Sequence, residues 1–385
     1  MIATSDRPVV TPHTPDDVRT AMRDLIAAGE PLQISGAATW RDAGAPLDAS
    51  QTLSLHHLSG ITEYVPGDLT ITALAGTSLA ELAHATAAHG QWLGLDPAGD
   101  RLGTIGATVA TASSGPLAHA FGTPRDLVLG LHAVTGYGDA VRPGGRVVKN
   151  VAGFDLVRLY TGAWGTLGPI TSVTLRLRAL PVHDVTLVMP LDDPSQLASV
   201  MPLLRANTVS LLAAEWIDGS TASSLGITGG SDAIVLRLGG NDRFVRGQRA
   251  LLDGIATNAA CDVSVWGALS LLDASSSAVV RLSGAVSDLP ARIARIRAAL
   301  TPTGTECSLH ASVGRGIIRL IVHVASDATR AALQRSDVGE RRIVERFPAA
   351  WWSTEADPFE GGLAARIRRA FDPQLLCNRR QVTHA

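Results

Sequence analysis

Apolar residues near the start of the chain recur every three or four positions, which is the spacing of one face of an α-helix. The stripe consists of Val18, Met22, Leu25 and Ile26. Thr14 precedes it as a capping residue, and a proline and two acids follow at positions that favour a helix start. The pattern predicts a helix that ends at Gly29, followed by a strand over 31–35 and a turn of small residues over 35–39.

Alternating apolar and polar residues then predict short strands over 53–55 and 69–74. A second helix is predicted from Ser78, because Ser78 and Glu81 have the spacing of a capping box, and it is expected to stop at Gly90. This mixture of strands and helices indicates an α+β domain. The Gly-Tyr-Gly-Asp run at 136–139 separates two further strand-like stretches, which is typical of a hairpin turn rather than of a dinucleotide-binding loop.

The pattern changes after Pro181, where strands with a period of two become more frequent. The predicted strands cover 208–216, 233–238, 278–282 and 316–324. One intervening helix is marked by apolar residues at helical spacing, namely Leu289, Ile293, Ile296 and Leu300. We expect an antiparallel sheet with helices on one face, which would cap the first domain. The expected divisions are 1–181 for the first domain, 182–345 for the cap, and 346–385 for a C-terminal segment that returns to the first domain.

Length and composition limit the possible classes of protein. A chain of 385 residues with 46% hydrophobic and 18% charged residues fits two globular domains. The net charge of -2 gives no electrostatic reason to expect a nucleic-acid partner. The sequence contains no apolar run long enough to cross a bilayer and no basic, apolar leader at its start. We therefore expect a cytoplasmic protein, attached at most peripherally to the inner face of the membrane through partners.

The three cysteines, Cys261, Cys307 and Cys377, are widely spaced and include no Cys-x-x-Cys pair. Their spacing argues against an iron-sulfur or zinc site in this chain, and they are expected to be reduced, mostly buried thiols.

Two stretches rich in glycine and small residues are candidates for binding a ligand. The stretch 103–115 offers hydroxyl groups among glycines and alanines, and the stretch 162–171 places three glycines just before a strand. Small residues let backbone N–H groups approach an anion such as a diphosphate. The same composition also permits close packing without any ligand, so the residues alone leave both interpretations open.

Lys149 is the only lysine among 33 basic residues. It lies in the run Gly-Arg-Val-Val-Lys-Asn-Val-Ala-Gly-Phe-Asp at 145–155. An arginine serves as well as a lysine at most solvated positions, so the retention of lysine in an arginine-biased chain indicates a specific requirement for a compact ammonium group. Chance retention on a surface turn is the alternative.

The run at 145–155, together with Gly-Thr-Leu-Gly-Pro-Ile-Thr at 165–171 and Gly-Thr-Ile-Gly-Ala-Thr-Val-Ala-Thr-Ala-Ser-Ser-Gly at 103–115, resembles the FAD-linked oxidases. These proteins have a flavin domain of the p-cresol-methylhydroxylase (PCMH) or vanillyl-alcohol-oxidase (VAO) type. Within them the likeness is to FAD-binding subunits of glycolate oxidase. It covers about 60–181 and returns at 371–378. The resemblance implies a two-part PCMH/VAO-type FAD-binding domain, an antiparallel-sheet-and-helix cap domain, and non-covalent FAD.

The resemblance also implies which residues bind FAD. The first loop of the family usually contains three consecutive glycines, whereas this chain has only Gly36 followed by alanines, so the loop is expected to be reshaped. An acidic residue common in the family is replaced by Trp164, and a tyrosine is replaced by Phe154. A lysine near the flavin N1 edge would stabilise the anion formed on reduction, and we assign this role to Lys149. The residues carried over are Gly36, Ala37, Thr39, Thr104, Gly106, Thr111, Ser114, Gly115, Lys149, Asn150, Phe154, Asp155, Gly165, Thr166, Gly168 and Ile170.

The substrate side has fewer sequence signals. Related subunits that oxidise 2-hydroxy acids carry a histidine-rich metal motif, which this sequence lacks, so no metal is expected and the catalytic residues stay unassigned. His310 and His323 stand alone in strand-like segments, where structural roles are more common than metal binding. Arg315 and Arg319 have the right chemistry to hold a substrate carboxylate, but surface ion pairing is the expected role.

The resemblance implies an FAD-dependent oxidoreductase that acts on CH-OH donors as a subunit of a glycolate oxidase (glycolate dehydrogenase). This complex would oxidise glycolate to glyoxylate. Its expected partners are a second FAD-linked oxidase subunit and an iron-sulfur subunit. Two alternatives stay open: a free-standing FAD-dependent 2-hydroxy-acid oxidoreductase, and a non-catalytic assembly subunit with a degraded flavin site.

Overall fold

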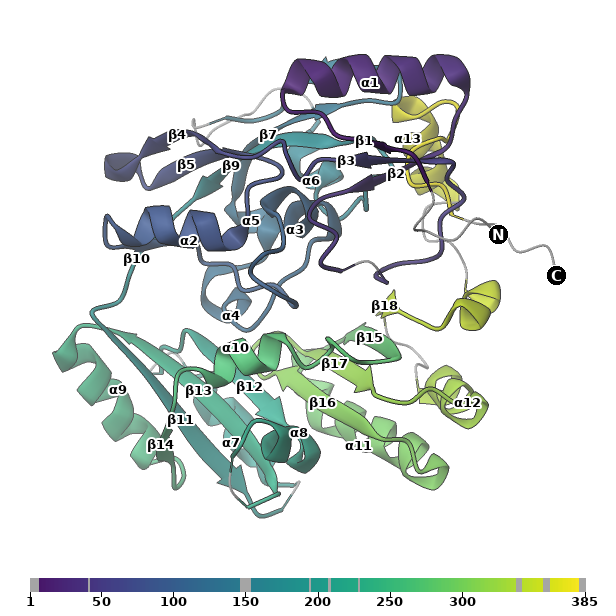
Figure 1. Ribbon diagram of the computed structural model, residues 1–385. Helices are drawn as coiled ribbons and strands as arrows, with labels where there is room; N and C mark the ends of the chain where they lie inside the picture. The colour runs from purple at the N-terminus through teal and green to yellow at the C-terminus, as the bar shows by residue number, and fades with distance from the viewer. Residues whose placement is uncertain are drawn as a thin grey trace.

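The computed structural model describes residues 7–40, 42–145, 154–193, 195–206, 209–227, 229–336, 341–355 and 361–380. They form two lobes of mixed α and β structure, one above the other in Figure 1. The upper lobe contains the N-terminal half of the chain and the last helix. The lower lobe contains one broad sheet. The fold class is therefore α+β, as predicted.

A small parallel sheet with the strand order β1-β3-β2 lies at one end of the upper lobe. Its strands are β1 (Val9–Val10), β2 (Leu32–Ser35) and β3 (Gln51–Ser54). Helix α1 (Pro15–Ala28) packs over it and begins at the predicted Thr14 cap, which forms a capping box with Asp17. The helix ends at Gly29, whose φ of 66° is in the left-handed region that glycine adopts readily. The first predicted helix is therefore confirmed.

A second sheet, in which all strand pairs are antiparallel, forms the rest of the upper lobe in the order β4-β5-β9-β7-β8. The strands are β4 (Ile61–Val65), β5 (Thr70–Leu74), β7 (Val128–Val134), β8 (Ala140–Val141) and β9 (Ile170–Arg176). The helices are η1 (Pro66–Asp68), α2 (Leu79–Ala87), α3 (Ile105–Thr111), α4 (Ala118–Phe121), α5 (Pro124–Leu127) and α6 (Leu156–Tyr160). Antiparallel pairing of β7 with β8 confirms the predicted hairpin around 136–139.

The lower lobe contains an eight-stranded antiparallel sheet in the order β14-β11-β13-β12-β16-β17-β15-β18. Its strands are β11 (His183–Leu191), β12 (Ala213–Ile217), β13 (Asp232–Gly240), β14 (Ala259–Cys261), β15 (Ala278–Ser283), β16 (Cys307–Ser312), β17 (Ile317–Val322) and β18 (Arg341–Arg346). A short pair, β6 (Gln91–Trp92) with β10 (Arg178–Ala179), lies just before the chain enters this sheet.

Helices cover both faces of the lower sheet, so the prediction of helices on one face was wrong. Residues of α7 (Gln196–Leu204), α9 (Asp242–Asp253), α11 (Leu289–Leu300) and α12 (Asp327–Ser336) contribute to one apolar core. Residues of α8 (Gly219–Ser224) and α10 (Val265–Ser270) contribute to a second core with the opposite sides of the same strands. The prediction failed because these two helices are one or two turns long and show little apolar periodicity.

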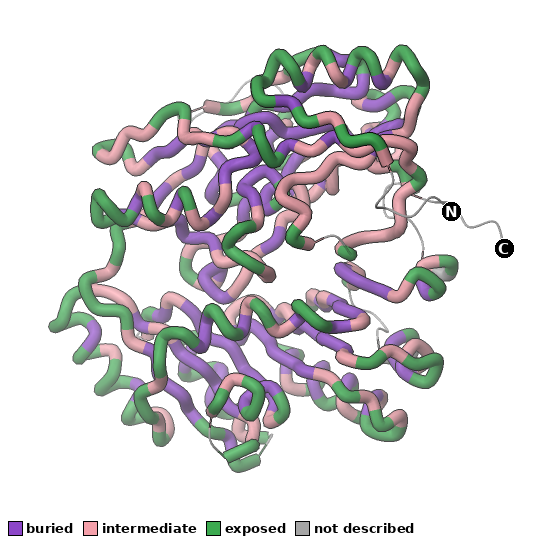
Figure 2. Tube along the Cα trace, viewed as in Figure 1, coloured by how far each residue is buried: buried purple, intermediate pink, exposed green. Residues whose placement is uncertain are grey.

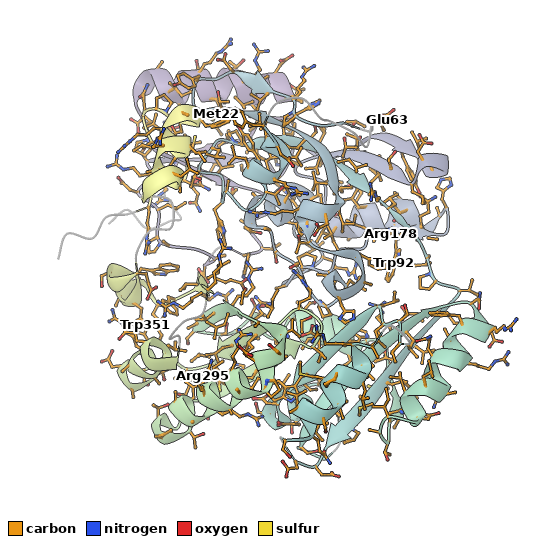
Figure 3. All side chains as sticks on the ribbon, turned by 180° about the vertical axis from the view of Figure 1, so that it is seen from behind. Met22, Glu63, Trp92, Arg178, Arg295 and Trp351 are labelled. Carbon is orange, nitrogen blue, oxygen red and sulfur yellow. The ribbon has the colours of Figure 1, made fainter. Side chains whose placement is uncertain are left out.

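The two lobes have separate apolar cores but touch through specific contacts. Figure 2 shows buried backbone concentrated inside each lobe. Across the junction, Arg237 of the lower lobe lies over the ring of Trp92 at 5.2 Å from its centroid, near the position labelled in Figure 3. The Gly44 N–H donates to the Glu345 carbonyl at 2.8 Å. The lobes are therefore held together by polar and cation-π contacts, which leave room for a cavity between them.

The end of the chain returns to the upper lobe. After β18 the chain passes through η4 (Ala349–Thr354) and forms α13 (Gly362–Phe371), which lies beside the small parallel sheet in Figure 1. Cys377 then forms a parallel bridge with Leu32 of β2. The remaining short helices, η2 (Val286–Asp288) and η3 (Thr301–Thr303), flank α11.

Candidate functional site

A cavity of about 890 Å³ lies between the two lobes. The upper lobe contributes the loop after β2, the start and end of α3, and the turn before β9. The lower lobe contributes the ends of β15, β17 and β18 and the turn before β17, and the C-terminal segment contributes Asn378 and Arg380. The volume is in the usual range for a site that holds a cofactor or small ligand.

Strained backbone is concentrated around this cavity. Six residues other than glycine have a positive φ in the described chain, and four of them line the cavity. The four are Ala38 (φ 54°), Ala112 (φ 50°), Trp164 (φ 53°) and Asn378 (φ 44°). Such a conformation costs an ordinary residue roughly 1–2 kcal/mol, and it is retained mainly where function or tight packing requires it. The backbone geometry therefore marks this cavity as the candidate site.

Eleven of the residues predicted from the sequence meet at this cavity. They are Gly36, Ala37, Thr39, Thr104, Gly106, Thr111, Ser114, Gly165, Thr166, Gly168 and Ile170. They come from three stretches that are far apart in sequence. Ala38 shows how the alanine-containing loop is accommodated, because it takes the positive φ that glycine usually supplies.

The other predicted residues lie elsewhere. Gly115 packs against the Asp96 carbonyl, where an added Cβ would lie 1.9 Å from the oxygen. Phe154 is 93% exposed, and Asp155 caps α6 by accepting from the Arg158 N–H at 3.1 Å. None of these three is among the residues that line the cavity. Lys149 and Asn150 lie outside the described residues, so their proposed contacts with FAD stay predictions from the sequence.

Two glycines allow the close approach of segments that build the cavity wall. A Cβ on Gly36 would lie 2.3 Å from the Thr104 hydroxyl oxygen, so glycine lets the loop after β2 pack on the start of α3. Gly168 has a φ of 115°, and a Cβ there would lie 2.0 Å from the Val134 carbonyl oxygen. Glycine is therefore required at both positions by local geometry.

The threonine hydroxyls of the cavity are largely engaged in local hydrogen bonds. Thr104 accepts from the Ala107 N–H at the start of α3. Thr111 and Thr166 donate to backbone carbonyls at 2.8 and 2.6 Å. The hydroxyls thus fix the loop shapes, and backbone N–H groups of the small-residue loops are the better candidates for contacting a diphosphate.

Asn378 joins two of the predicted loops, which the sequence analysis did not foresee. Its side-chain oxygen accepts from the Ile34 N–H at 2.7 Å, and its side-chain nitrogen donates to the Trp164 carbonyl at 2.6 Å. Its own backbone N–H donates to the Leu32 carbonyl at 3.0 Å. The partners lie more than 200 residues away in sequence, so no local pattern could have revealed this clamp.

Arginines dominate the charge of the cavity. Six of them line it: Arg125, Arg281, Arg315, Arg341, Arg342 and Arg380. Glu355 is the one carboxylate among the described lining residues, and it pairs with Arg342 at 2.5 Å. The described wall is therefore strongly cationic, which suits an anionic ligand. Four of these arginines come from the lower lobe, where the sequence analysis had singled out only Arg315 and Arg319.

Arg319 is not a surface residue, so that prediction was wrong. It is 9% exposed and is paired with Glu345 at 2.7 Å and with Asp273 at 2.9 Å. These two carboxylates raise the pKa of Arg319, although burial opposes the charge. Arg319 is thus committed to a buried ion network in the sheet and does not line the cavity.

The described wall of the cavity offers few acid-base groups. The Tyr160 hydroxyl donates to the Leu167 carbonyl at 3.3 Å, and burial raises the pKa of Tyr160 well above its usual range. His310 lies in the lower sheet with its Nδ1 3.0 Å from a Glu215 oxygen, and His323 hydrogen-bonds Ser308 at 2.9 Å. Neither histidine lines the cavity, and no three metal-binding side chains gather within the described chain.

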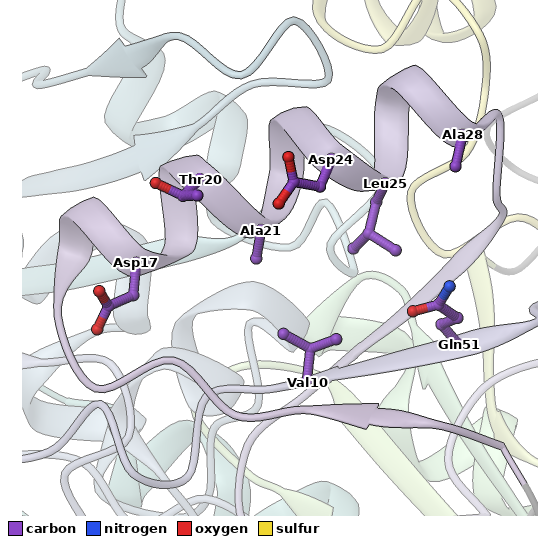
Figure 4. A pocket seen from close by; sticks show the side chains of 8 residues that line it. All are labelled: Val10, Asp17, Thr20, Ala21, Asp24, Leu25, Ala28 and Gln51. Atoms are coloured by element: carbon purple, nitrogen blue, oxygen red, sulfur yellow. The ribbon is translucent and has the colours of Figure 1, made fainter.

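A second hollow, of about 490 Å³, lies between α1 and the small parallel sheet (Figure 4). Asp17 and Asp24 line it together with apolar and neutral polar side chains. Two carboxylates without a facing basic residue in the lining disfavour an anionic ligand. The interlobe cavity is therefore the better candidate for a cofactor that carries phosphates.

Comparison with known proteins finds a family match for much of the upper lobe. Residues 7–144 match the family model described as "FAD binding domain". Glycolate oxidase subunit GlcE of Escherichia coli (strain K12) is 33% identical over 235 residues, which cover 60% of this chain and 63% of the relative. Glycolate oxidase subunit GlcD of Bacillus subtilis (strain 168) is 28% identical over 55% of this chain and 46% of the relative. A D-2-hydroxyglutarate dehydrogenase of Stutzerimonas stutzeri (strain A1501) is 30% identical over 51% of this chain and 42% of the relative. The matches thus span less than two thirds of each of these relatives.

Solved structures share the fold over almost the whole chain. An alkyldihydroxyacetonephosphate synthase superposes with a TM-score of 0.71 at 15% identity, covering 97% of this chain and 76% of the other. A 4-ethylphenol oxidase from Gulosibacter chungangensis superposes with a TM-score of 0.72 at 14% identity, covering 96% and 88%. At these identities the likeness shows the fold alone. Within the part of the chain that the structure describes, no helix is long and apolar enough to cross a membrane.

Proposed function

Because the chain carries the FAD binding domain of an FAD-linked oxidoreductase, we propose that it is the FAD-binding subunit of a complex that oxidises a small 2-hydroxy acid. The leading reaction is the oxidation of glycolate to glyoxylate. Bound FAD would accept the hydride equivalent from the carbon that carries the hydroxyl group. The observation that carries this proposal is the cavity in which loops of small residues face a wall of arginines.

The residues of the upper wall fit FAD. The loop of Gly36, Ala37, Ala38 and Thr39 and the turn at Gly165 present small side chains to the cavity. Ala38 and Trp164 hold these turns in left-handed conformations, which are typical of backbone concavities that bind anions. Arg125 of the same lobe and Arg380 of the C-terminal segment add positive charge near them. The diphosphate would thus be held by backbone N–H groups and screened by arginines.

The charge of the lower wall suits the carboxylate of a 2-hydroxy acid. A carboxylate in a cavity lined by Arg281 and Arg315 would be oriented by charge-assisted hydrogen bonds. Oxidation of the alcohol also requires an acceptor for the hydroxyl proton. Among the described lining residues, Glu355 is paired with Arg342 and Tyr160 donates to a carbonyl, so neither is suited to accept it. We therefore propose that a partner subunit completes the site.

Two partners follow from this proposal. A second FAD-linked oxidase subunit would supply the missing proton acceptor or a complete site of its own, and an iron-sulfur subunit would take the electrons onward. The names of the relatives GlcE and GlcD, both glycolate oxidase subunits, support an assembly of related chains.

The deciding experiment is a near-ultraviolet and visible absorption spectrum of the purified chain, repeated anaerobically after glycolate is added. We expect the flavin bands to be present and to stay oxidised in the isolated chain. They should bleach when the second flavin subunit is added. Bleaching by the isolated chain would instead show a free-standing oxidoreductase, and a colourless protein that does not take up added FAD would leave only an assembly role.

A further inference from the structure

The arginines of the lower lobe that line the cavity lie close together at one end of its sheet. Ser283 of β15 pairs with Ile317 of β17 on one side and with Arg341 of β18 on the other. Arg281 lies two residues before Ser283 and therefore points to the same face of the sheet. Arg315 lies in the turn that leads into Ile317. Arg281 and Arg341 are therefore diagonal neighbours on β15 and β18, a relation in which residues lie roughly 7–8 Å apart. Their long side chains and that of Arg315 are expected to reach one small ligand.

One of these arginines is held in place by the buried ion network behind it. Arg281 Nε is 3.3 Å from one oxygen of Glu345, whose other oxygen pairs with Arg319. Arg319 is held by Asp273 as well. Glu345 is therefore shared between two arginines and only partly offsets the charge of Arg281.

The other two arginines are less compensated. Arg315 and Arg341 have no carboxylate within 4.0 Å in the described part of the chain. Burial lowers the pKa of Arg315. Glu215 and Asp126 raise this pKa from longer range, and the positive charge of Arg281 lowers it. Arg315 is half-buried, where a cation without a paired anion is costly, whereas Arg341 is exposed. The uncompensated charge of Arg315 therefore favours the binding of an anionic ligand at this cluster.

We propose that Arg281, Arg315 and Arg341 form a subsite for a small organic dianion, so that the acid bound by this chain carries a second carboxylate. This inference rests on the proposed oxidation of a small 2-hydroxy acid in this cavity, and it names a 2-hydroxy dicarboxylic acid in place of glycolate, which has only one carboxylate. Each carboxylate can engage one guanidinium with two parallel hydrogen bonds, so two carboxylates use the cluster more fully than one. The loops expected to hold the FAD diphosphate belong to the opposite lobe, so we expect a ligand other than the diphosphate at this cluster.

The test compares two ligands with the same number of carbon atoms, succinate and butyrate, by titration calorimetry at fixed ionic strength and neutral pH. Neither has a hydroxyl group, so neither is turned over. The intact FAD-loaded chain is expected to bind succinate at least about tenfold more tightly than butyrate. Arg315→Gln and Arg341→Gln should each weaken succinate binding by about tenfold and change butyrate binding less.

Arg249→Gln is the matched control, since Arg249 is an exposed arginine of α9 in the same lobe. It should leave succinate binding unchanged, and all variants should keep the thermal midpoint of the parent. Equal affinity for the two ligands, no binding of either, or an equal loss in Arg249→Gln would overturn the proposal. The titration needs no turnover, so it reads the subsite even if the chain fails to oxidise glycolate. Conversely, if glycolate reduces the flavin but succinate binds no more tightly than butyrate, the subsite is refuted and the proposed function still holds.

Discussion

The two walls of the cavity differ in the groups that they offer to an anionic ligand. The upper wall uses small, mostly uncharged residues in irregular loops, and three of its residues, Ala38, Ala112 and Trp164, take unfavourable left-handed conformations. The lower wall uses arginines on β15 and β18 and in the turn before β17, and Arg281 among them is backed by the buried carboxylate of Glu345. Backbone N–H groups suit a ligand whose position is fixed, such as a cofactor. Long charged side chains suit a ligand that must enter and leave. The upper wall is therefore expected to be sensitive to shape and the lower wall to charge.

The largest loss of stability from a change in side-chain size is expected at Gly168. In Gly168→Ala the new Cβ would lie 2.0 Å from the Val134 carbonyl oxygen, and the φ of 115° disfavours any side chain. We expect a loss of about 4 kcal/mol in the free energy of unfolding, measured by chemical denaturation.

Gly247→Ala is the contrasting variant in the lower lobe. Gly247 lies inside α9 with nothing within 4 Å of its Cβ position. This change should stabilise the protein by about 0.5–1 kcal/mol, because alanine is the better helix former. If both substitutions had similar effects, the distinction between a shape-sensitive wall and a regular lobe would not hold.

In the lower lobe, the substitution with the largest expected loss of stability is Glu345→Gln. Glu345 is 4% exposed and pairs with Arg319 at 2.7 Å, so its loss leaves buried positive charge that Asp273 only partly offsets. We expect the free energy of unfolding to fall by about 3 kcal/mol. FAD affinity should change little, because the loops proposed to hold FAD lie on the opposite lobe. Fluorescence of bound FAD, measured beside the denaturation curve, distinguishes a change in FAD affinity from a change in the free energy of unfolding.

Asp184→Asn is the control variant, because it removes an ion pair with Arg237 that is more exposed, with 27% of the Asp184 side chain accessible. It should cost about 1 kcal/mol or less. A larger loss from Asp184→Asn than from Glu345→Gln would contradict the role given to the buried network.

A smaller effect, but one specific to the cofactor, is expected from Asn378→Ala. It removes the hydrogen bonds to the Ile34 N–H and the Trp164 carbonyl and leaves both partners partly buried. We expect a loss of about 2 kcal/mol in stability and a roughly tenfold weaker affinity for FAD. Asn258→Ala in the lower lobe, which removes a hydrogen bond to Asp253, is the control and should leave FAD affinity unchanged. Loss of stability without loss of FAD affinity would mean that Asn378 acts only in folding.

The parts of the fold that follow local rules could be predicted from the sequence. The start of α1 at Thr14 and its end at Gly29 are set by neighbouring residues, as is the hairpin at 136–139. The small-residue loops could be recognised because their composition is itself the signal. By contrast, Asn378 and Ile34 are separated by 344 positions, and Arg281 and Arg341 become neighbours only through strand pairing. Their roles depend on tertiary contacts that leave no local pattern, which is why the clamp and the arginine cluster were missed.

A pH-dependent effect on stability is expected from Asp96, which lies near the junction between the two lobes. Asp96 lies in the upper lobe and accepts from the Leu117 N–H at 2.9 and 3.1 Å. Burial raises its pKa to about 7, while Arg237 and Glu215 of the lower lobe act on it in opposite directions. A carboxyl whose pKa is higher in the folded state than in the unfolded state favours folding when it is protonated. Its contribution is therefore present below the unfolded pKa of 3.8 and is lost as the pH rises from there toward about 7.

Asp96→Asn removes this titration while it keeps an oxygen that can accept from Leu117. Between pH 5 and 6 the parent should lose about 1 kcal/mol of stability relative to the variant, because the unfolded state releases close to one proton more in that range. Above about pH 8 the difference should become constant, since Asp96 is then ionised in both states. Denaturation curves at several pH values measure the difference directly, and all other titrating groups largely cancel between the two proteins. Parallel stability profiles would show that Asp96 is solvated in the folded protein and that the junction between the lobes is open to water.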